Sequence, residues 1–299
     1  MSWPETTRAV KASGSGSERT FSVDTVALPS TLPADDILIK VLASAVPFSA
    51  DIDAAASPLR LASPRPWGVD LVGVVIGVGE FVSNVSVGDH VAAILPLDDA
   101  FGALADHCVI SSSLAVPLPA GLDARAAASA LGPGFEALWS LGKLSRVSAG
   151  DSVLIVDAAT PAGLMTIQLA LHLRLQVVAG VASAEQQAAL QAALGDRAAA
   201  VSVLILSPAT FVAAVAEATA GDLFDAVIEA QGEHDVAGKR CELLPFHMAA
   251  ALGPGAQWVS RRKALQLDPP VSRALFCKGA AVAFLNAQAN FLAPNRLGV

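Results

Sequence analysis

The chain is poor in cysteine, and what cysteine it has is scattered. Its three cysteines, Cys108, Cys241 and Cys277, lie far apart, and none belongs to a C-x-x-C pair. Such spacing provides neither a disulfide framework nor a structural zinc site. The cysteine content fits a reducing compartment, and we expect a cytoplasmic protein.

Positive charge is also scarce. The 299 residues include 19 Lys and Arg against 27 Asp and Glu, a net charge of −8. Binding to nucleic acid or to an anionic membrane surface needs a basic patch, so the sequence predicts neither partner. The one basic run, residues 261–263, is expected to be a solvated loop.

Long apolar runs are missing as well. The N-terminus has no apolar core of a secretory signal. The notable uncharged stretch, residues 198–216, contains Ser202, Pro208 and Thr210, and we interpret it as strand, turn and helix rather than as a membrane span. With 54% hydrophobic and 15% charged residues, the chain is predicted to be globular and long enough for two domains.

The most informative stretch is SVLIVDAATPAGLMTIQLA, residues 152–170. Its run of aliphatic residues at 153–156 predicts a buried parallel strand, and a turn follows at 157–162. Gly163 then opens a segment expected to be a helix, with one apolar side formed by Leu164, Ile167, Leu169 and Leu171. Strand, tight turn and helix in this order are typical of the start of a dinucleotide-binding βαβ unit.

The second half of the chain continues this alternation. Strands are predicted at 176–181, 200–206, 224–229, 257–260 and 281–285, and helices at 185–194 and 211–219. Strands that alternate with helices at such spacing predict an α/β fold with a parallel, doubly wound sheet.

The first half is predicted to be mainly β structure. Strands are expected at 37–42, 71–78 and 90–95, with another after 102, and residues 1–20 form a frayed start or a loose hairpin. Glycines at 73, 77 and 79 are interpreted as bends of a small β-barrel rather than as a phosphate site, because no helix follows them.

A helical region is predicted to join the two halves. Asp123 is a candidate N-cap. We expect two helical segments after it, 124–131 and 135–144, broken by the sequence Gly132-Pro133-Gly134.

Several stretches in one order resemble a known family: ILIKVLASAV, GVDLVGVVIGVGEFVSNVSVGDHV, VPLPAGLDARAAASAL, AGDSVLIVDAATPAGLMTIQLA and FDAVIEAQG. They resemble the medium-chain dehydrogenase/reductase superfamily in its zinc-free quinone oxidoreductase branch, over roughly residues 35–286. The resemblance implies a GroES-like β-barrel domain at 1–122, a Rossmann domain at 123–288 and a truncated return to the barrel at 289–299. It also implies a homodimer formed through the edge near 281–285.

The resemblance bears on metal and catalysis too. Zinc-using relatives have a His-Glu pair where this chain has Val69-Asp70, and a Cys in the stretch that corresponds to residues 45–49, so we predict no metal. Zinc-free relatives have an Asn where Pro47 stands and often a Tyr, which this chain lacks altogether. The sequence therefore assigns no catalytic residue, although a nicotinamide cofactor itself carries the chemistry of hydride transfer.

The turn after the central strand is the predicted phosphate site. A pyrophosphate needs free backbone N–H groups and the positive end of a helix dipole. Of the glycines of G-x-G-x-x-G only the last is present, Pro161 lacks an N–H although it suits a first helical position, and Asp157 adds a negative charge. The predicted cofactor residues here are Ala159, Thr160, Pro161, Ala162 and Gly163.

The second strand decides between the two nicotinamide dinucleotides. An acid that binds the ribose of NAD is expected roughly 20 residues after the glycine turn, and none ends this strand. Ser183 stands there and could bond a 2′-phosphate, so NADP is favoured over NAD, although no Lys or Arg lies between Arg174 and Arg197. The resemblance places Glu229 and Gln231 near the ribose and nicotinamide, with Phe284 and Leu285 beside the nicotinamide.

Two hypotheses of function follow. The first is a zinc-independent, NADPH-dependent reductase of quinones or enones. The second is a catalytically degenerate member of the family that serves as a binding or assembly module, or as a nucleotide sensor. Fold alone does not choose between them.

Overall fold

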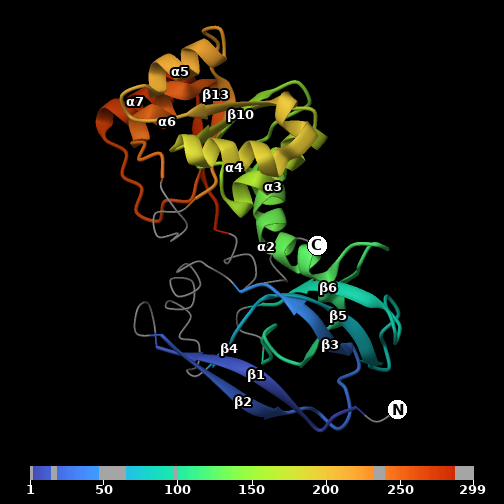
Figure 1. Cartoon of the computed structure of the whole chain (residues 1–299). Helices are drawn as coiled ribbons and strands as arrows, with labels where there is room; N and C mark the ends of the chain where they lie inside the picture. Colours follow the sequence, from blue (N-terminus) through green and yellow to red (C-terminus); the bar gives the residue numbers. More distant parts are fainter. Residues whose placement is uncertain (1–2, 15–18, 47–64, 97–99, 232–239, 287–299) are drawn as a thin grey trace. The chain divides into compact units, whose positions relative to one another are not determined.

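A computed structural model describes residues 3–14, 19–46, 65–96, 100–231 and 240–286. The chain divides into two compact units, here called unit 1, which runs to Gly132, and unit 2, which begins at Pro133 (Figure 1). Unit 1 is built of β-strands and unit 2 alternates strands with helices, as the sequence predicts.

Unit 1 contains a five-stranded antiparallel sheet in the order β7-β3-β5-β6-β8 and a three-stranded sheet in the order β2-β1-β4. The strands are β1 (Thr6–Ser13), β2 (Thr20–Ala27), β3 (Asp36–Ser44), β4 (Arg65–Pro66), β5 (Asp70–Val78), β6 (His90–Ile94), β7 (His107–Ser111) and β8 (Ala115–Pro117), with the short helix η2 (Ser112–Leu114). The predicted N-terminal hairpin is present, since β1 pairs with β2 along its whole length. Residues 47–64, which include Pro47, lie outside the described residues.

The glycines of β5 serve strand geometry. A side chain at Gly73 would overlap the carbonyl oxygen of Lys40 on β3, and the β3–β5 register shifts twice along its length. Gly79 likewise approaches the backbone carbonyls of Pro33 and Ala34. The prediction of a bent, closely packed β unit is confirmed.

His107, at the start of β7, makes the stability of unit 1 depend on pH. Burial lowers the pKa of His107, and its Nδ1 is buried without a hydrogen-bond partner among the described residues. As the pH falls below 6.5, the ordinary pKa of imidazole, His107 is protonated in the unfolded chain before it is protonated in the folded chain. The free energy of unfolding of unit 1 therefore decreases. One such proton gives a slope of at most about 1.4 kcal/mol per pH unit.

We expect urea midpoints of unit 1, measured from pH 8 to pH 5, to fall more steeply in the wild type than in His107→Gln, which cannot titrate. Parallel slopes for the two proteins would show that the imidazole does not carry the effect.

Unit 2 is a six-stranded sheet in which every neighbouring pair of strands is parallel, in the order β11-β10-β9-β12-β13-β14. Its strands are β9 (Ser152–Val156), β10 (Gln176–Val181), β11 (Val201–Ile205), β12 (Phe224–Glu229), β13 (Leu252–Ser260) and β14 (Ala281–Phe284). Its helical elements are α2 (Ala124–Trp139), which begins in unit 1, η3 (Ser140–Leu144), α3 (Pro161–His172), α4 (Ala184–Leu194), η4 (Gly195–Ala200), α5 (Phe211–Ala218), α6 (Pro245–Ala251) and α7 (Pro269–Lys278).

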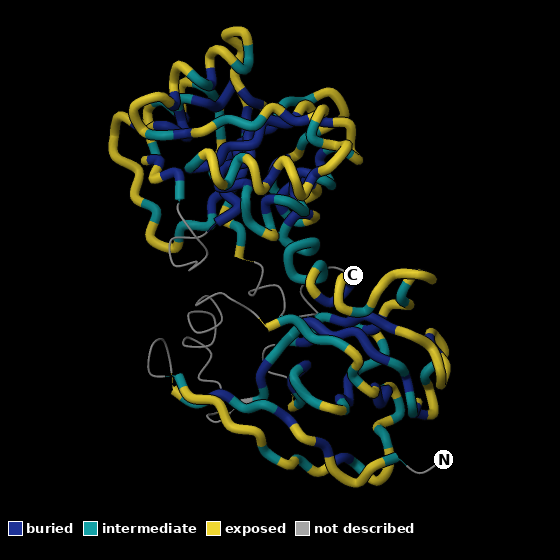
Figure 2. The backbone as a smooth tube through the Cα atoms, in the orientation of Figure 1, coloured by how far each residue is buried: buried dark blue, intermediate teal, exposed yellow. Residues whose placement is uncertain are grey.

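Helices cover both faces of this sheet, and its central strands are buried (Figure 2). Val153 and Ile155 of β9 pack in one cluster with Ile167 of α3. Leu154 and Val156 face the opposite cluster, which includes Trp258. Burial on both faces explains why the strand is a continuous aliphatic run rather than an alternating pattern.

The apolar residues predicted for α3 pack against one core cluster: Ile167 belongs to it, and Leu164, Leu169 and Leu171 are partly buried against it. One detail of α2 differs from the sequence prediction. The Gly-Pro-Gly sequence does not break the connecting helix: α2 runs unbroken from Ala124 to Trp139 with Pro133 inside it, and a π-helical turn, η3, follows.

The prediction of two segments was wrong because tertiary packing outweighs the cost of a proline in a helix, about 3 kcal/mol. Ala127 and Ala128 are buried before Pro133, and Ala137 and Leu141 after it. Asp123 is the N-cap, as predicted: its Oδ2 accepts hydrogen bonds from the N–H groups of Arg125 and Ala126, both at 3.0 Å.

The sequence prediction missed α6 and α7. Both begin with proline at the first helical position, and α7 ends at Gly279 with a left-handed φ of 59°, so the signals were present. Lys278 caps the C-terminus of α6: its Nζ donates to the carbonyls of Ala249, Ala250 and Leu252 at 2.7–3.2 Å.

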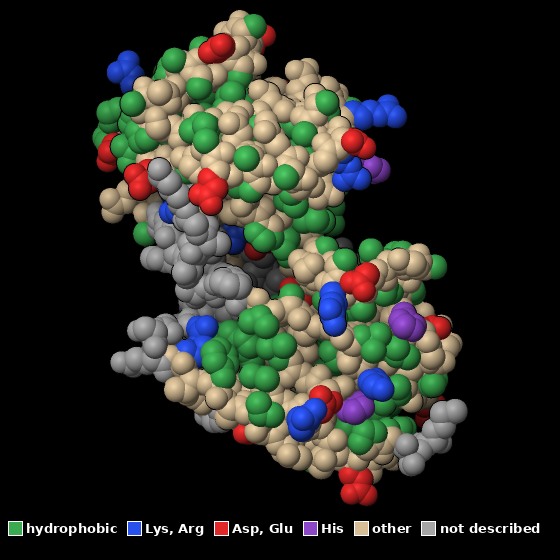
Figure 3. All heavy atoms as spheres, in the orientation of Figure 1, with side chains coloured by type: hydrophobic (Ala, Val, Ile, Leu, Met, Phe, Trp, Pro, Cys, Tyr) green, Lys and Arg blue, Asp and Glu red, His purple; other side chains and the backbone are tan. Residues whose placement is uncertain are grey.

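The distribution of Lys and Arg on the surface is consistent with the low content of positive charge in the sequence (Figure 3). On the face drawn in Figure 3 the Lys and Arg side chains are dispersed rather than gathered into one large patch. Among the described residues, no helix combines the length and hydropathy that a bilayer crossing needs.

Candidate nucleotide site

The order of strands defines a topological switch point at the carboxyl edge of the sheet in unit 2. From β9 the chain continues to β10 on one side, and later places β12 on the other. Such a point, where the strand order reverses, is where α/β sheets bind their ligands. All ten predicted cofactor residues lie at this edge, in or after β9, β10, β12 and β14: Ala159–Gly163, Ser183, Glu229, Gln231, Phe284 and Leu285.

Asp157 begins the turn after β9. It has a left-handed φ of 57°, which glycine adopts most readily and Asp tolerates. Its carboxylate is buried: Oδ1 accepts a hydrogen bond from the N–H of Cys241 at 2.7 Å, and Oδ2 lies 3.8 Å from Nε of Arg240. The negative charge expected beside the phosphate is therefore partly compensated by the segment at 240–241.

Cys241 is a buried free thiol at this edge. Burial, with the Asp157 carboxylate next in importance, strongly raises the pKa of Cys241. The thiolate is the reactive form of cysteine, so this thiol is inert at neutral pH. Cys108 and Cys277 are likewise free thiols.

The N-terminus of α3 is capped by its own chain. Thr160 is the N-cap: its hydroxyl accepts from the N–H of Gly163 at 3.1 Å and donates to the carbonyl of Asp157 at 3.2 Å. Pro161 occupies the first helical position and has no N–H to offer. The helix dipole remains, but this turn presents fewer N–H donors than a glycine-rich one.

Gly163 keeps the role of the last glycine in the motif. A Cβ at this position would lie 2.7 Å from the carbonyl carbon and the Cα of Ala158 and would overlap its oxygen. Only glycine lets α3 approach the end of β9 this closely.

Ser183 is the N-cap of α4. Its hydroxyl accepts from the N–H of Gln186 at 3.3 Å, while Oε1 of Gln186 accepts from the N–H of Ala182 at 2.8 Å. The cap thus uses the hydroxyl of Ser183, and Gln186 also holds the residue before the cap. An acid at the end of β10 is absent from the sequence, and the nearest one, Glu185, is exposed on α4.

Glu229, at the end of β12, is saturated by other side chains. It is 1% exposed, and its Oε2 accepts from Trp258 Nε1 at 3.2 Å and from Ser260 Oγ at 2.6 Å. Its Oε1 pairs with the guanidinium of Arg262, at 2.7 Å from Nε and 2.6 Å from Nη2. Arg262 also donates to the carbonyl of Leu243 at 2.7 Å.

The arginines after β13 therefore correct the prediction of a solvated basic loop. The side chain of Arg262 is 11% exposed and that of Arg261 is 10% exposed. Arg261 forms an ion pair with Glu136 of α2. Sequence alone could not reveal these partners, because the residues of each pair are separated by 33 and 125 positions.

The remaining predicted residues, Gln231, Phe284 and Leu285, lie at the same edge of the sheet. Gln231 is 1% exposed, Phe284 is 58% exposed, and Leu285 continues the sheet through its N–H to the carbonyl of Ser260 at 2.9 Å. In unit 1, Asp70 is buried, and within the described ranges no three His, Cys, Asp or Glu side chains group as metal ligands would.

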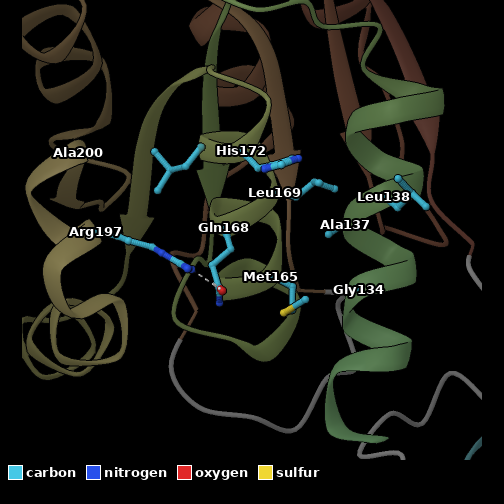
Figure 4. Close-up of a pocket in the computed structure, with 10 residues that line it drawn as sticks. Gly134, Ala137, Leu138, Met165, Gln168, Leu169, His172, Arg197 and Ala200 are labelled. Carbon is cyan, nitrogen blue, oxygen red and sulfur yellow. Dashed lines mark hydrogen bonds between the residues drawn. The ribbon is translucent and has the colours of Figure 1, made fainter. Parts of the chain in front are cut away.

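A separate groove of about 780 Å³ lies along the outer face of α3, between α2 and η4 (Figure 4). Leu138, Met165 and Leu169 form apolar walls, and Arg197 Nη1 donates to Gln168 Oε1 at 2.8 Å across it. None of the ten predicted cofactor residues lines this groove, so it is distinct from the switch point at the carboxyl edge.

Comparison with known proteins agrees with this architecture. The model of the alcohol dehydrogenase GroES-like domain matches residues 33–120. Quinone oxidoreductase-like protein 1 of Mus musculus is 34% identical over 226 residues, which are 74% of this chain and 65% of the relative. The chloroplastic NADPH-dependent alkenal/one oxidoreductase of Arabidopsis thaliana is 34% identical over 167 residues, 51% of this chain and 41% of the relative.

A solved mycobacterial protein in complex with NADPH has the same fold. Its TM-score is 0.69 at 25% sequence identity, over 95% of this chain and 83% of that chain. This chain spans less than two thirds of the length of either curated relative named above.

The chain has the fold of the medium-chain dehydrogenase/reductase superfamily, with a GroES-like unit followed by a Rossmann unit. Within that superfamily it is similar to the quinone oxidoreductases, including quinone oxidoreductase-like protein 1.

Proposed function

We propose that the chain is a zinc-independent oxidoreductase that transfers hydride from NADPH to a quinone or an enone. The observation that carries the proposal is the switch point at the carboxyl ends of β9 and β12, where α3 begins with Gly163 in close contact with Ala158. Relatives named for quinone and for alkenal/one substrates support the substrate class.

The residues of the edge fit a dinucleotide in part. Residues 159–163 would hold the pyrophosphate, and the hydroxyl of Ser183 would face the ribose of the adenosine half. Glu229 would act through its neighbours, because its own oxygens are occupied. The bound cofactor would supply the hydride, and this chain's residues would orient it.

NADP remains favoured over NAD because β10 ends without an acid. The sixth strand, β14, pairs with β13 at the edge of the sheet, and we propose that a homodimer forms there. The cytoplasmic location stays a prediction.

A titration of the full chain with NADPH, followed by cofactor fluorescence, tests the proposal. We expect saturable binding below millimolar cofactor and oxidation of NADPH when a quinone is added. Absence of binding at millimolar cofactor would contradict the proposal. Binding without oxidation across quinones and enones would instead favour the nucleotide sensor.

Replacing Pro161 by glycine is expected to strengthen NADPH binding. The substitution restores one backbone N–H at the first turn of α3, and one hydrogen bond to a charged group is worth about 1.5–3 kcal/mol before the entropy of the added glycine is subtracted. Dissociation constants of the two proteins provide the measurement. Equal values would mean that the N–H at position 161 does not face the phosphate.

A further inference from the structure

We infer that Arg240 supplies the positive charge that holds the cofactor's pyrophosphate at the turn after β9. The inference rests on the proposed function, since it presupposes a dinucleotide at this edge. It concerns a residue outside the glycine motif, in the segment that follows β12.

The first argument is the balance of charge and donors at the turn. Pro161 has no N–H, the N–H of Gly163 is bonded to Thr160, and Asp157 brings a full negative charge. The dipole of α3 contributes only about half a positive charge. Without a cation nearby, this turn would repel a pyrophosphate.

The second argument is the state of the Arg240 guanidinium. Its Nε is 3.8 Å from Asp157 Oδ2, beyond hydrogen-bond distance, and it is buried without a hydrogen-bond partner among the described residues. Buried donors are almost always paired, so an orphaned one marks a missing acceptor. The side chain is 26% exposed, which leaves part of the guanidinium open to a ligand.

The third argument is a contrast with the other arginines of the same edge. Arg262 donates to Glu229 and to the carbonyl of Leu243, and Arg261 is paired with Glu136. Arg240 alone among these three has a charged neighbour but no hydrogen bond to it. The positive charge of Arg240 is therefore not satisfied by a hydrogen bond to a carboxylate among the described residues, as the charges of Arg261 and Arg262 are.

Asp157 is then the positioning residue. Its Oδ1 holds the N–H of Cys241 at 2.7 Å, which fixes the backbone next to Arg240 against the turn. Its Oδ2 draws the guanidinium toward the same turn. One carboxylate thus anchors the segment and aims its cation at the phosphate site.

The test is NADPH binding by Arg240→Gln in the full chain, with inorganic pyrophosphate as the competitor and with salt varied. We expect binding about tenfold weaker than in the wild type, since a charge-assisted hydrogen bond is lost. Competition by pyrophosphate and the dependence on salt should weaken in parallel. Arg240→Lys should retain most of the affinity, because it keeps the charge.

Arg174→Gln is the matched control. It removes the same charge from an exposed position between α3 and β10, at the opposite edge of the sheet, and should bind NADPH like the wild type. Equal affinity and salt dependence for Arg240→Gln and the wild type would overturn the inference and leave the proposed function intact. A wild type that does not bind NADPH would overturn both. If Arg240→Gln does not fold, Arg240→Lys decides, and a tenfold loss in that variant would contradict a role of charge.

Discussion

Replacing Glu229 by alanine is expected to lower the free energy of unfolding of unit 2 by about 3–5 kcal/mol, the usual cost of removing one partner of a buried ion pair. The carboxylate accepts from Trp258, Ser260 and Arg262, and its removal leaves three donors without an acceptor in a buried site. Glu229→Gln keeps the shape and one acceptor but loses the charge, so we expect a loss of about 1.5–3 kcal/mol.

Urea unfolding, with hydrogen exchange to assign the change to β12 and β13, measures both variants. Glu217→Ala is the control, because Glu217 is exposed on α5 and its removal should change stability by less than about 0.5 kcal/mol. If Glu229→Ala and Glu217→Ala were equally stable, the hydrogen bonds of Glu229 to Trp258, Ser260 and Arg262 would contribute nothing to the free energy of unfolding.

Replacing Gly163 by alanine is expected to destabilise unit 2, although helix propensity predicts the opposite. Propensity alone favours alanine by about 1 kcal/mol. The added Cβ, however, would be fixed to the backbone of α3 and would lie 2.7 Å from the backbone carbonyl carbon of Ala158. Since neither backbone can yield without moving α3 away from β9, the overlap should outweigh propensity, with a net loss of about 1–3 kcal/mol.

Gly134→Ala separates the two effects. Gly134 lies in α2, and the nearest atom that its added Cβ would meet is Met165 Cε at 3.5 Å, an ordinary contact with a flexible side chain. This variant should gain about 0.4–1 kcal/mol. Thermal unfolding of both variants is the measurement, and stabilisation of both would show that α3 tolerates a shift away from the sheet.

The fold of unit 2 was predictable because its signals are local. The run at Val153–Val156, the turn and the glycine at 163 lie within a dozen residues, and the alternation of strands and helices sets the sheet. The limits of β10 and β12 were predicted as they are observed. Pattern placed the start of α3 at Gly163, two residues after the observed first residue of the helix, Pro161.

The chemistry of the edge was less predictable because it depends on pairs distant in sequence. Nothing local tells that Glu229 faces Arg262, or that Asp157 holds the N–H of Cys241, which is 84 positions away. A composition rule treats Arg261 and Arg262 as solvated, whereas the fold buries them against carboxylates. The Gly-Pro-Gly sequence also does not show that α2 continues through Pro133, because Ala127 and Ala128 pack with Val72 of β5 and Ala92 of β6, which are distant in sequence.

Helix α2 has a practical consequence for dissecting the molecule. The border between the β unit and the Rossmann unit falls at Gly132, inside an uninterrupted helix. Ala127 and Ala128 before this border pack with Val72 and Ala92, and Ala137 after it is also buried. A protease site introduced there would leave two half-helices whose backbone groups lack hydrogen-bond partners. A fragment of the Rossmann unit meant to fold alone should therefore include all of α2, from Asp123 onward.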